Sequence, residues 1–189
     1  SHPRRRPDPH STARTTRSEA ARAIGAGLRR LHEALPVEEE IERVTPVLEA
    51  LRRELPGHVR LSVDTFHAPV ARAALEVGAD LINDTTGLSD PQMAATVAET
   101  GASLVITHSL AQPRRPYAHP RYEDVVQEVR AFLADRLDRA LAAGIPRERI
   151  VLDPGPDLNK STVQTLEMLR DWHEYASLGL PLLAALSRK

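Results

Sequence analysis

The chain has 189 residues, enough for one domain with a sizeable core. Hydrophobic residues make up 41% and charged residues 27%, as in an ordinary globular protein, while aromatic residues make up only 3%, so the core must be aliphatic. The formal net charge of -1 gives no reason to expect a nucleic-acid partner, and no apolar run approaches the roughly 18 residues of a membrane span. The absence of cysteine excludes disulfides and thiolate metal sites and suits a cytoplasmic location.

Residues 1–35 differ in composition from the rest of the chain. Between Ser1 and Arg30 there are eight arginines against two acidic residues, and no strand-like apolar run. We expect a basic, disordered tail. A nucleic-acid-binding arm is less well supported, because no aromatic residue is interleaved for base stacking. An organelle transit peptide and an out-of-frame reading are further alternatives for this segment. Residues 36–189 are predicted to form one domain.

From residue 36 onward, helical and strand patterns alternate. The predicted elements are a helix over Val37–Glu54, a strand over 59–64, a helix over 69–76, a strand over 79–84, a helix from Pro91 towards Glu99 with Asp90 as its cap, a strand over 103–108, a helix over 123–143, a strand over 149–153, a helix over 162–175 and a strand over 180–186. Strands that alternate with helices predict an α/β protein with a parallel sheet. Five strands fit an open doubly wound sheet or part of a (β/α)8 barrel. No G-x-G-x-x-G follows a strand, which disfavours dinucleotide binding.

Polar residues stand at the carboxyl end of every predicted strand. They are Asp64-Thr65, Asn83-Asp84, Thr107-His108, Asp153 and Ser187-Arg188-Lys189. In parallel α/β proteins this rim is where ligands bind. Carboxylates, an amide and two cations suit a flat heterocycle that presents both donors and acceptors, with an anionic group nearby. A helix cap or a turn former is the alternative reading for Asp64 or Asp153 taken singly.

Two further residues near this rim have less specific signals. His108 has no second histidine at a metal-ligand spacing, so contact with a substrate or a structural role is expected rather than metal binding or acid catalysis. Lys160 lies in Asp153-Pro-Gly-Pro-Asp-Leu-Asn-Lys160, which is glycine-poor for a phosphate cradle. We predict that Lys160 is a solvated loop lysine.

Four short motifs occur in a distinctive order along the chain. They are Ser62-Val-Asp-Thr65, Gly78-Ala-Asp-Leu-Ile-Asn-Asp84, Leu152-Asp-Pro-Gly155 and Ser187-Arg-Lys189. In order and spacing they resemble the motifs of dihydropteroate synthases, and the resemblance runs from about Val37 to Lys189. The first motif alone is a weak signal, whereas the ordered set is specific.

The resemblance implies a TIM-barrel fold of the (β/α)8 type, with strands three to seven in this chain. It also implies a pterin pocket and a neighbouring p-aminobenzoate edge. The pterin residues would be Asp64, Asn83, Asp153 and Lys189, and the edge residues would be Ser187 and Arg188. In the family reaction, 6-hydroxymethyl-7,8-dihydropterin diphosphate condenses with p-aminobenzoate and pyrophosphate leaves, with Mg²⁺ stabilising the departing charge. The implied partners are these two small molecules, and family members commonly form homodimers.

The chain departs from the family pattern in several places. The N-x-T-P-D-S-F-S-D-G-G segment, whose Asn binds magnesium, and the G-E-S-T-R-P-G loop are absent, so no metal ligand is expected in this chain. The usual M-H-M is Thr107-His-Ser109 and the usual G-F-G-K is Asp157-Leu-Asn-Lys160. These changes resemble diverged second copies of the enzyme found in actinobacteria.

These departures bear on activity. A closed barrel typically takes about 250 residues, with roughly 200 near the lower limit, so the barrel is expected to be incomplete. We therefore expect the chain by itself to lack synthase activity. An inactive fragment or paralogue that at most binds a pterin is one alternative. A methyltetrahydrofolate-dependent methyltransferase, which shares the pterin-binding barrel, is another, but the Ser187-Arg-Lys189 motif favours the synthase.

Overall fold

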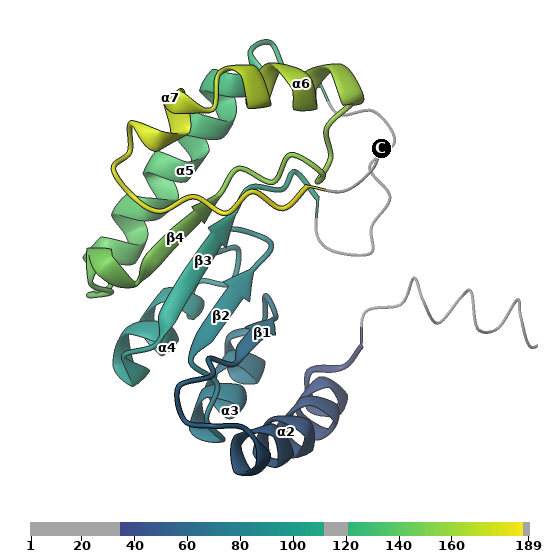
Figure 1. Cartoon of the computed structure of the whole chain (residues 1–189), viewed down its shortest axis with the longest axis vertical. Helices are drawn as coiled ribbons and strands as arrows, with labels where there is room; N and C mark the ends of the chain where they lie inside the picture. Colours follow the sequence, from purple (N-terminus) through teal and green to yellow (C-terminus); the bar gives the residue numbers. More distant parts are fainter. Residues whose placement is uncertain (1–34, 112–120, 187–189) are drawn as a thin grey trace, which may run out of the picture. The chain divides into compact units, whose positions relative to one another are not determined.

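The computed structural model describes residues 35–111 and 121–186, and helices alternate with strands along them (Figure 1). The elements are α2 (Val37–Glu54), β1 (Ser62–Asp64), α3 (Ala68–Glu76), β2 (Leu81–Asp84), α4 (Met93–Thr100), β3 (Ser103–Thr107), α5 (Val125–Ala142), the 3₁₀ turn η1 (Arg147–Arg149), β4 (Ile150–Asp153), α6 (Thr162–Arg170) and α7 (His173–Ala176). Residues 1–34 of the predicted tail, as well as Ser187, Arg188 and Lys189, lie outside the described residues. No helix within 35–111 or 121–186 has the length and apolar character needed to cross a membrane.

The four strands form one parallel sheet in the order β1-β2-β3-β4. Asp64 pairs with Asn83 across the first two strands, and Thr107 pairs with Asp153 across the last two. The predicted parallel arrangement and strand order are therefore confirmed for these four strands. Because parallel strands all point the same way, their carboxyl ends meet at one edge of the sheet.

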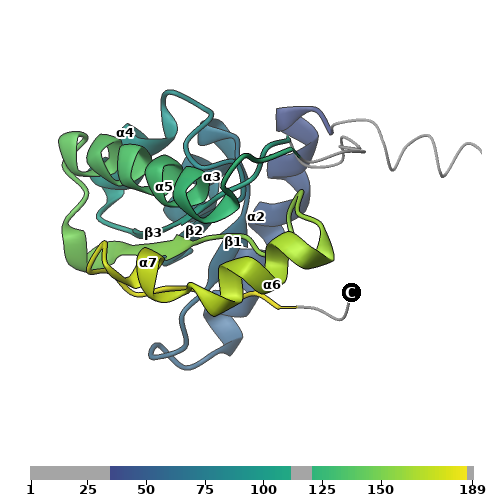
Figure 2. The ribbon, with the colours of Figure 1, turned by 90° about the horizontal axis from the view of Figure 1, so that it is seen from above.

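One face of the sheet is a buried aliphatic layer. Alternate strand residues point to this face, and they are Val63, Ile82, Leu104, Ile106, Ile150 and Leu152, all 7% exposed or less. Helices α3, α4 and α5 lie together on one side of the strands (Figure 2). The predicted aliphatic core is confirmed, and the opposite face of the strands carries the polar residues of the rim.

The predicted fifth strand at 180–186 is wrong in extent, because only Leu182 pairs with the sheet, through a single parallel bridge to Leu152. The backbone N–H of Leu152 donates to the Pro181 carbonyl at 3.0 Å, and the N–H of Leu183 donates to the Leu152 carbonyl at 2.8 Å. The next bonds of this ladder would need N–H groups from Pro181 and Pro154, and proline has none. Two prolines therefore limit the fifth strand to one bridge.

Two predicted helices also differ from the observed ones. The helix predicted from Pro91 begins two residues later, at Met93, with Gln92 rather than Asp90 at its N-cap position. The Asp90 carboxylate accepts from the N–H of Gln92 at 2.9 Å and from that of Ala68 at 2.8 Å. The helix predicted over 162–175 is divided into α6 and α7. Ser161 and Gln164 form a reciprocal capping box at the start of α6.

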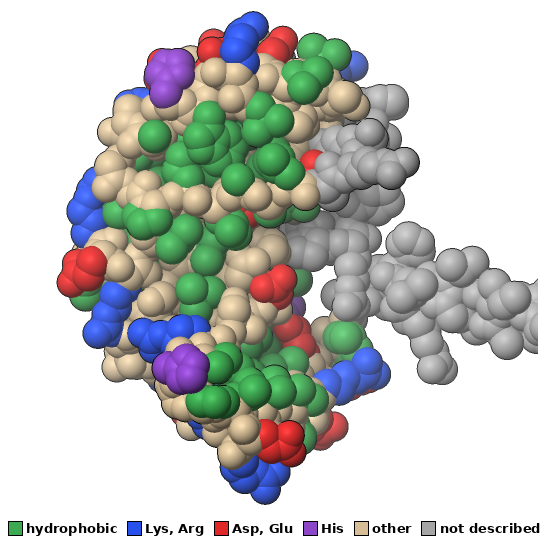
Figure 3. Space-filling model, viewed as in Figure 1, with side chains coloured by type: hydrophobic (Ala, Val, Ile, Leu, Met, Phe, Trp, Pro, Cys, Tyr) green, Lys and Arg blue, Asp and Glu red, His purple; other side chains and the backbone are tan. Residues whose placement is uncertain are grey.

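Some large hydrophobic side chains stay exposed on α6 and on the segment after α7. Figure 3 shows hydrophobic side chains gathered over this part of the molecule. Those with the greatest exposure there are Val163, Leu166, Leu169, Leu183 and Leu186. The core behind α3, α4 and α5 is thus closed, whereas the outer side of α6 is not covered by described residues.

Gly155 sits where the loop after β4 passes close to the end of β3. Its φ is +61°, and a Cβ atom at this position would lie 2.3 Å from the carbonyl oxygen of His108. Gly144, after α5, also has a positive φ of +95°, but nothing lies within 4 Å of its would-be Cβ. The two glycines therefore share a backbone requirement and differ in their surroundings.

Gly155→Ala should destabilise the protein more than Gly144→Ala. Both substitutions place a side chain at positive φ, which costs about 1–2 kcal/mol. Gly155→Ala should add about 1–3 kcal/mol, because backbone must move away from the new methyl group. Urea unfolding of both variants measures the difference, and equal losses would contradict the close approach at Gly155.

Candidate functional site

A row of polar side chains lies at the carboxyl ends of the strands, on the face opposite the aliphatic layer. The Asn83 Nδ2 donates to Asp64 Oδ1 at 3.0 Å. The Thr107 hydroxyl lies 3.4 Å from Asn83 Oδ1 and 3.5 Å from Asp153 Oδ2. Each of the four residues comes from a different strand. Register pairs Asp64 with Asn83 and Thr107 with Asp153, and Asn83 pairs with Val105, so Thr107 lies two residues further along β3 on the same face of the sheet.

A cavity of about 290 Å³ opens on this row. Its lining comes from β2, β3, β4 and the segments that follow them, and consists of Asn83, Thr85, Thr107, Asp153, Gly155, Asp157, Leu158, Ala185 and Leu186. Two of the predicted pterin residues, Asn83 and Asp153, therefore line one cavity. Asp64 does not line the cavity, but it accepts a hydrogen bond from Asn83, which does. Lys189, Ser187 and Arg188 lie beyond the described residues, although Leu186 at the cavity immediately precedes them.

Asp153 is the most buried carboxylate of the cavity, at 4% exposed. Its Oδ1 accepts from the Gly155 N–H at 2.8 Å, so the turn-former reading applies to one oxygen. The other oxygen, Oδ2, faces Thr107. Burial raises the pKa of the Asp153 carboxyl, while the Gly155 N–H and the charge of Lys160 act in the opposite direction. The helix-cap reading is wrong, because α6 is capped by Ser161.

Asp84 follows Asn83 directly but faces the other side of the sheet. It is fully buried, and its carboxylate accepts from the N–H and the hydroxyl of Thr86, both at 2.8 Å, and from the Leu88 N–H at 2.7 Å. Burial raises the pKa of this carboxyl too. Asp84 therefore organises the turn after β2, whose Leu88 has a φ of +62°. Of the Asn83-Asp84 pair, only Asn83 belongs to the cavity.

Lys160 is buried, and the prediction of a solvated loop lysine is wrong. The residue is 7% exposed, and its Nζ lies 3.0 Å from His108 Nδ1, 2.8 Å from the Gly155 carbonyl and 2.9 Å from the Leu158 carbonyl. Loop 154–160 folds back over the end of β3, which no periodicity in the sequence indicates. A buried ammonium beside the cavity is thus a feature that the sequence analysis missed.

His108 is the partner of Lys160 beneath this loop. It is 2% exposed, and its ring meets Phe132 edge-on with the centroids 4.8 Å apart. Burial, and secondly the charge of Lys160, lower the pKa of His108 to about 3. The imidazole is therefore neutral at pH 7, and Nδ1 can accept from the ammonium. This geometry supports the structural role that was one of the two expectations for His108.

Within residues 35–111 and 121–186, no group of three or more His, Cys, Asp or Glu side chains is arranged to hold a metal ion. This part of the chain therefore has no cage of carboxylates or imidazoles for the magnesium ion that the family resemblance implies.

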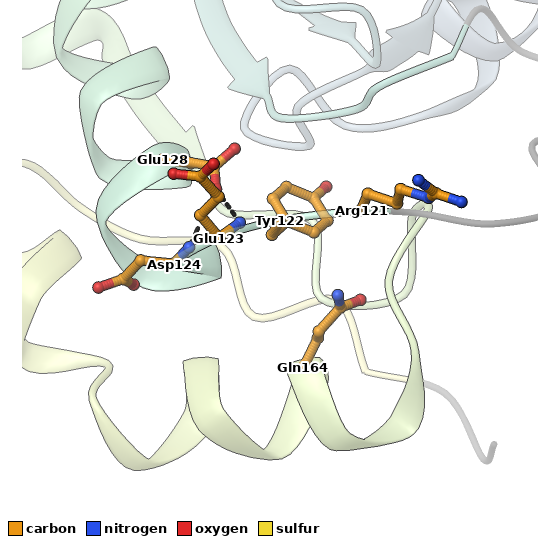
Figure 4. Close-up of a pocket in the computed structure, with 6 residues that line it drawn as sticks. All are labelled: Arg121, Tyr122, Glu123, Asp124, Glu128 and Gln164. Carbon is orange, nitrogen blue, oxygen red and sulfur yellow. Dashed lines mark hydrogen bonds between the residues drawn. The ribbon is translucent and has the colours of Figure 1, made fainter.

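A larger, open pocket of about 810 Å³ lies at the start of α5 (Figure 4). Arg121, Tyr122, Glu123, Asp124, Glu128 and Gln164 line it. Two of its carboxylates already accept hydrogen bonds from backbone N–H groups at the start of the helix: Glu128 accepts from those of Glu123 and Asp124, and Asp124 accepts from those of Val126 and Gln127. The smaller cavity is the better candidate site, because buried polar groups from neighbouring strands converge on it.

The fold and the site define an α/β protein whose ligand cavity lies at the carboxyl ends of parallel strands. The chain belongs to the pterin-binding enzyme family, whose family model matches residues 12–189.

Known relatives carry the name dihydropteroate synthase. The enzyme of Haemophilus influenzae is 41% identical over 152 residues, which are 80% of this chain and 54% of that protein. The structure of the Xanthomonas albilineans enzyme with 4-aminobenzoic acid superposes with a TM-score of 0.74 at 41% identity, covering 83% of this chain and 55% of that one. The Thermus thermophilus enzyme in complex with 6HMPPP gives 0.71 at 46% identity, covering 83% and 59%.

These relatives also establish the fold class. The structural relatives are TIM-barrel proteins, and the four described strands form part of such a barrel wall without closing it. The predicted class, an incomplete (β/α)8 barrel, is confirmed. The chain spans about half the length of the relatives named above.

The buried His108 should make the free energy of unfolding depend on pH. Its folded pKa of about 3 lies below the unfolded value of 6.5, so the unfolded state binds the extra proton between these values. The stabilisation is complete above pH 6.5 and is lost as the pH falls towards 3, by up to about 1.4 kcal/mol per pH unit. Urea unfolding at several pH values should give a shallower slope for His108→Asn than for the unmodified chain.

The matched control for this measurement is His173→Asn, because the His173 side chain is 75% exposed. It should leave the slope unchanged. Parallel slopes for His108→Asn and the unmodified chain would show that His108 is not the titrating group.

Asp84→Ala and Asn83→Ala should differ in stability although the residues are adjacent. Asp84→Ala leaves buried N–H and hydroxyl donors without an acceptor and should lower the free energy of unfolding by about 1–3 kcal/mol or more. Asn83→Ala, on the cavity side, should cost about 1 kcal/mol or less. Chemical denaturation distinguishes the two, and a reversed order would contradict their assignment to opposite faces.

Proposed function

We propose that this chain is the pterin-binding part of a dihydropteroate synthase. The observation that carries the proposal is the cavity in which Asn83, Thr107 and Asp153 converge at the carboxyl ends of β2, β3 and β4. The relatives with the same fold support it, since they carry the synthase name and include structures with 4-aminobenzoic acid and 6HMPPP. These relatives do not favour the alternative, a pterin-binding module without catalysis.

The chemistry of the cavity suits a pterin. A pterin presents a ring N–H and an exocyclic amine side by side, and a carboxylate accepts from both kinds of donor. Asp153 Oδ2 is buried and already faces the cavity, so binding needs little further desolvation of this group. The apolar side chains of Leu158 and Leu186 offer surfaces against which a flat ring can pack. Lys189 is proposed as a further pterin contact, and Ser187 and Arg188 as contacts for p-aminobenzoate.

In the proposed reaction, the amine nitrogen of p-aminobenzoate attacks the methylene carbon attached to the pterin. The carbon–nitrogen bond forms as the carbon–oxygen bond breaks, pyrophosphate leaves, and the nitrogen loses a proton. The described residues contribute by binding and orienting the pterin, which places its methylene carbon for attack. When bound, magnesium would stabilise the departing charge, and the roles proposed for Asn83 and Asp153 do not depend on it. The homodimer and the cytoplasmic location stay predictions.

Replacing Asp153 should weaken pterin binding. Asp153→Asn replaces one acceptor oxygen by an amide donor and should reduce the affinity for 6-hydroxymethylpterin by about 1–3 kcal/mol, the cost of losing a charge-assisted hydrogen bond. Isothermal titration calorimetry with the purified chain measures this change. Asp138→Asn is the matched control, since Asp138 is exposed on α5 and should leave the affinity unchanged.

Binding and turnover should be measured separately. The proposal requires that the unmodified chain binds the pterin, and absence of measurable binding at millimolar pterin would contradict it. A synthase assay with magnesium, the pterin diphosphate and p-aminobenzoate then tests the expectation that this chain alone does not turn over. Turnover of roughly 1 per second, as in ordinary enzymes, would show that expectation to be wrong.

A further inference from the structure

Thr107 occupies a central position in the candidate site. It is the last residue of β3, pairs in register with Asp153, and lines the cavity together with Asn83 and Asp153. Its methyl carbon Cγ2 lies 3.5 Å from the position that a Cβ on Gly155 would occupy. The methyl group therefore points to the loop after β4, and the hydroxyl points to the polar row.

The Thr107 hydroxyl faces two acceptors with a single proton. Its Oγ1 is 3.4 Å from Asn83 Oδ1 and 3.5 Å from Asp153 Oδ2. A hydroxyl can donate to only one of these oxygens at a time. Both O···O distances exceed the 2.5–3.0 Å or so of a well-formed O–H···O hydrogen bond, so the hydroxyl proton is not firmly bound to either acceptor oxygen.

The other polar side-chain atom of Asn83 and that of Asp153 each already make a hydrogen bond within the protein. Asn83 Nδ2 donates to Asp64 Oδ1 at 3.0 Å, which orients the amide so that Oδ1 faces Thr107. Asp153 Oδ1 accepts from the Gly155 N–H at 2.8 Å, which leaves Oδ2 for Thr107 or for a ligand. The direction of one hydroxyl proton thus decides which oxygen still needs a donor.

We propose that Thr107 is a positioning residue that supplies the Asn83 oxygen with a donor when a ligand N–H takes Asp153 Oδ2. This inference rests on the proposed function, because it assumes a heterocycle with N–H donors in the cavity. A bound ring excludes water from the row, so an acceptor without a donor becomes costly only in the complex. The Thr107 hydroxyl turns to Asn83 and removes that cost.

Two substitutions separate the hydroxyl from the shape of the side chain. Thr107→Val keeps the shape and loses the hydroxyl, whereas Thr107→Ser keeps the hydroxyl and loses the methyl group near Gly155. If Thr107 acts only by packing, Thr107→Ser should bind pterin more weakly than Thr107→Val. If the hydroxyl supplies Asn83, the order is reversed.

The test is a calorimetric titration of the full chain and its variants with 6-hydroxymethylpterin. Thr107→Val should bind about fivefold or more weakly, the scale of an acceptor left unsatisfied in a dry site, and Thr107→Ser should stay within about twofold of the unmodified chain. Adding Thr107→Val to Asn83→Ala should cost almost nothing further, because the acceptor that the hydroxyl serves is already absent.

The outcomes distinguish this inference from the function on which it rests. If the unmodified chain binds the pterin and Thr107→Val binds equally well, the role of Thr107 is overturned and the proposed function stands. A full fivefold loss on adding Thr107→Val to Asn83→Ala would also overturn it, because the hydroxyl would then act on some other group. If the unmodified chain binds no pterin, the proposed function fails and this inference fails with it.

Discussion

The in-register parallel pairing of β1 to β4 is the constraint on which the rest of the structure depends. Parallel pairing brings all carboxyl ends to one edge, and register decides which residues stand side by side there. The pleat then sends neighbouring residues to opposite faces, so Asn83 joins the cavity while Asp84 holds a buried turn. A slip of one residue would exchange the two faces and bury the polar row in the aliphatic layer.

The loop after β4 completes the cavity by folding back over β3. Gly155 permits the close approach to the His108 carbonyl, and Lys160 anchors the loop through His108 and two backbone carbonyls. Taking an ammonium out of water is costly unless its N–H groups find acceptors, and each of these contacts supplies one. The positive charge of Lys160 also lowers the pKa of Asp153, against the effect of burial, which raises it. Lys160 therefore both holds the loop and influences the carboxyl group of the site.

The site and the family relationship explain different parts of the proposed activity. The described residues provide a place where a flat heterocycle can be held by Asp153 and its neighbours. They include no group of three or more His, Cys, Asp or Glu side chains arranged around a metal ion, and the chain spans about half the length of relatives that carry the synthase name. Binding of the pterin is thus the step of the proposed activity that the geometry of the described residues addresses directly.

The sequence by itself predicted three features: the alternation of helix and strand, the aliphatic core and the polar residues after each strand. It could do so because each of these depends on residues that are neighbours in the sequence. Val37–Glu54 was predicted to the residue for this reason. The ordered motifs likewise indicated the family. Two features depended on contacts between distant segments: the burial of Lys160 in loop 154–160, and the reduction of the fifth strand to one bridge, on either side of which Pro154 and Pro181 lack the N–H groups that would extend the ladder. Only the tertiary structure decided these, since each needs two segments to meet whose approach no local pattern encodes.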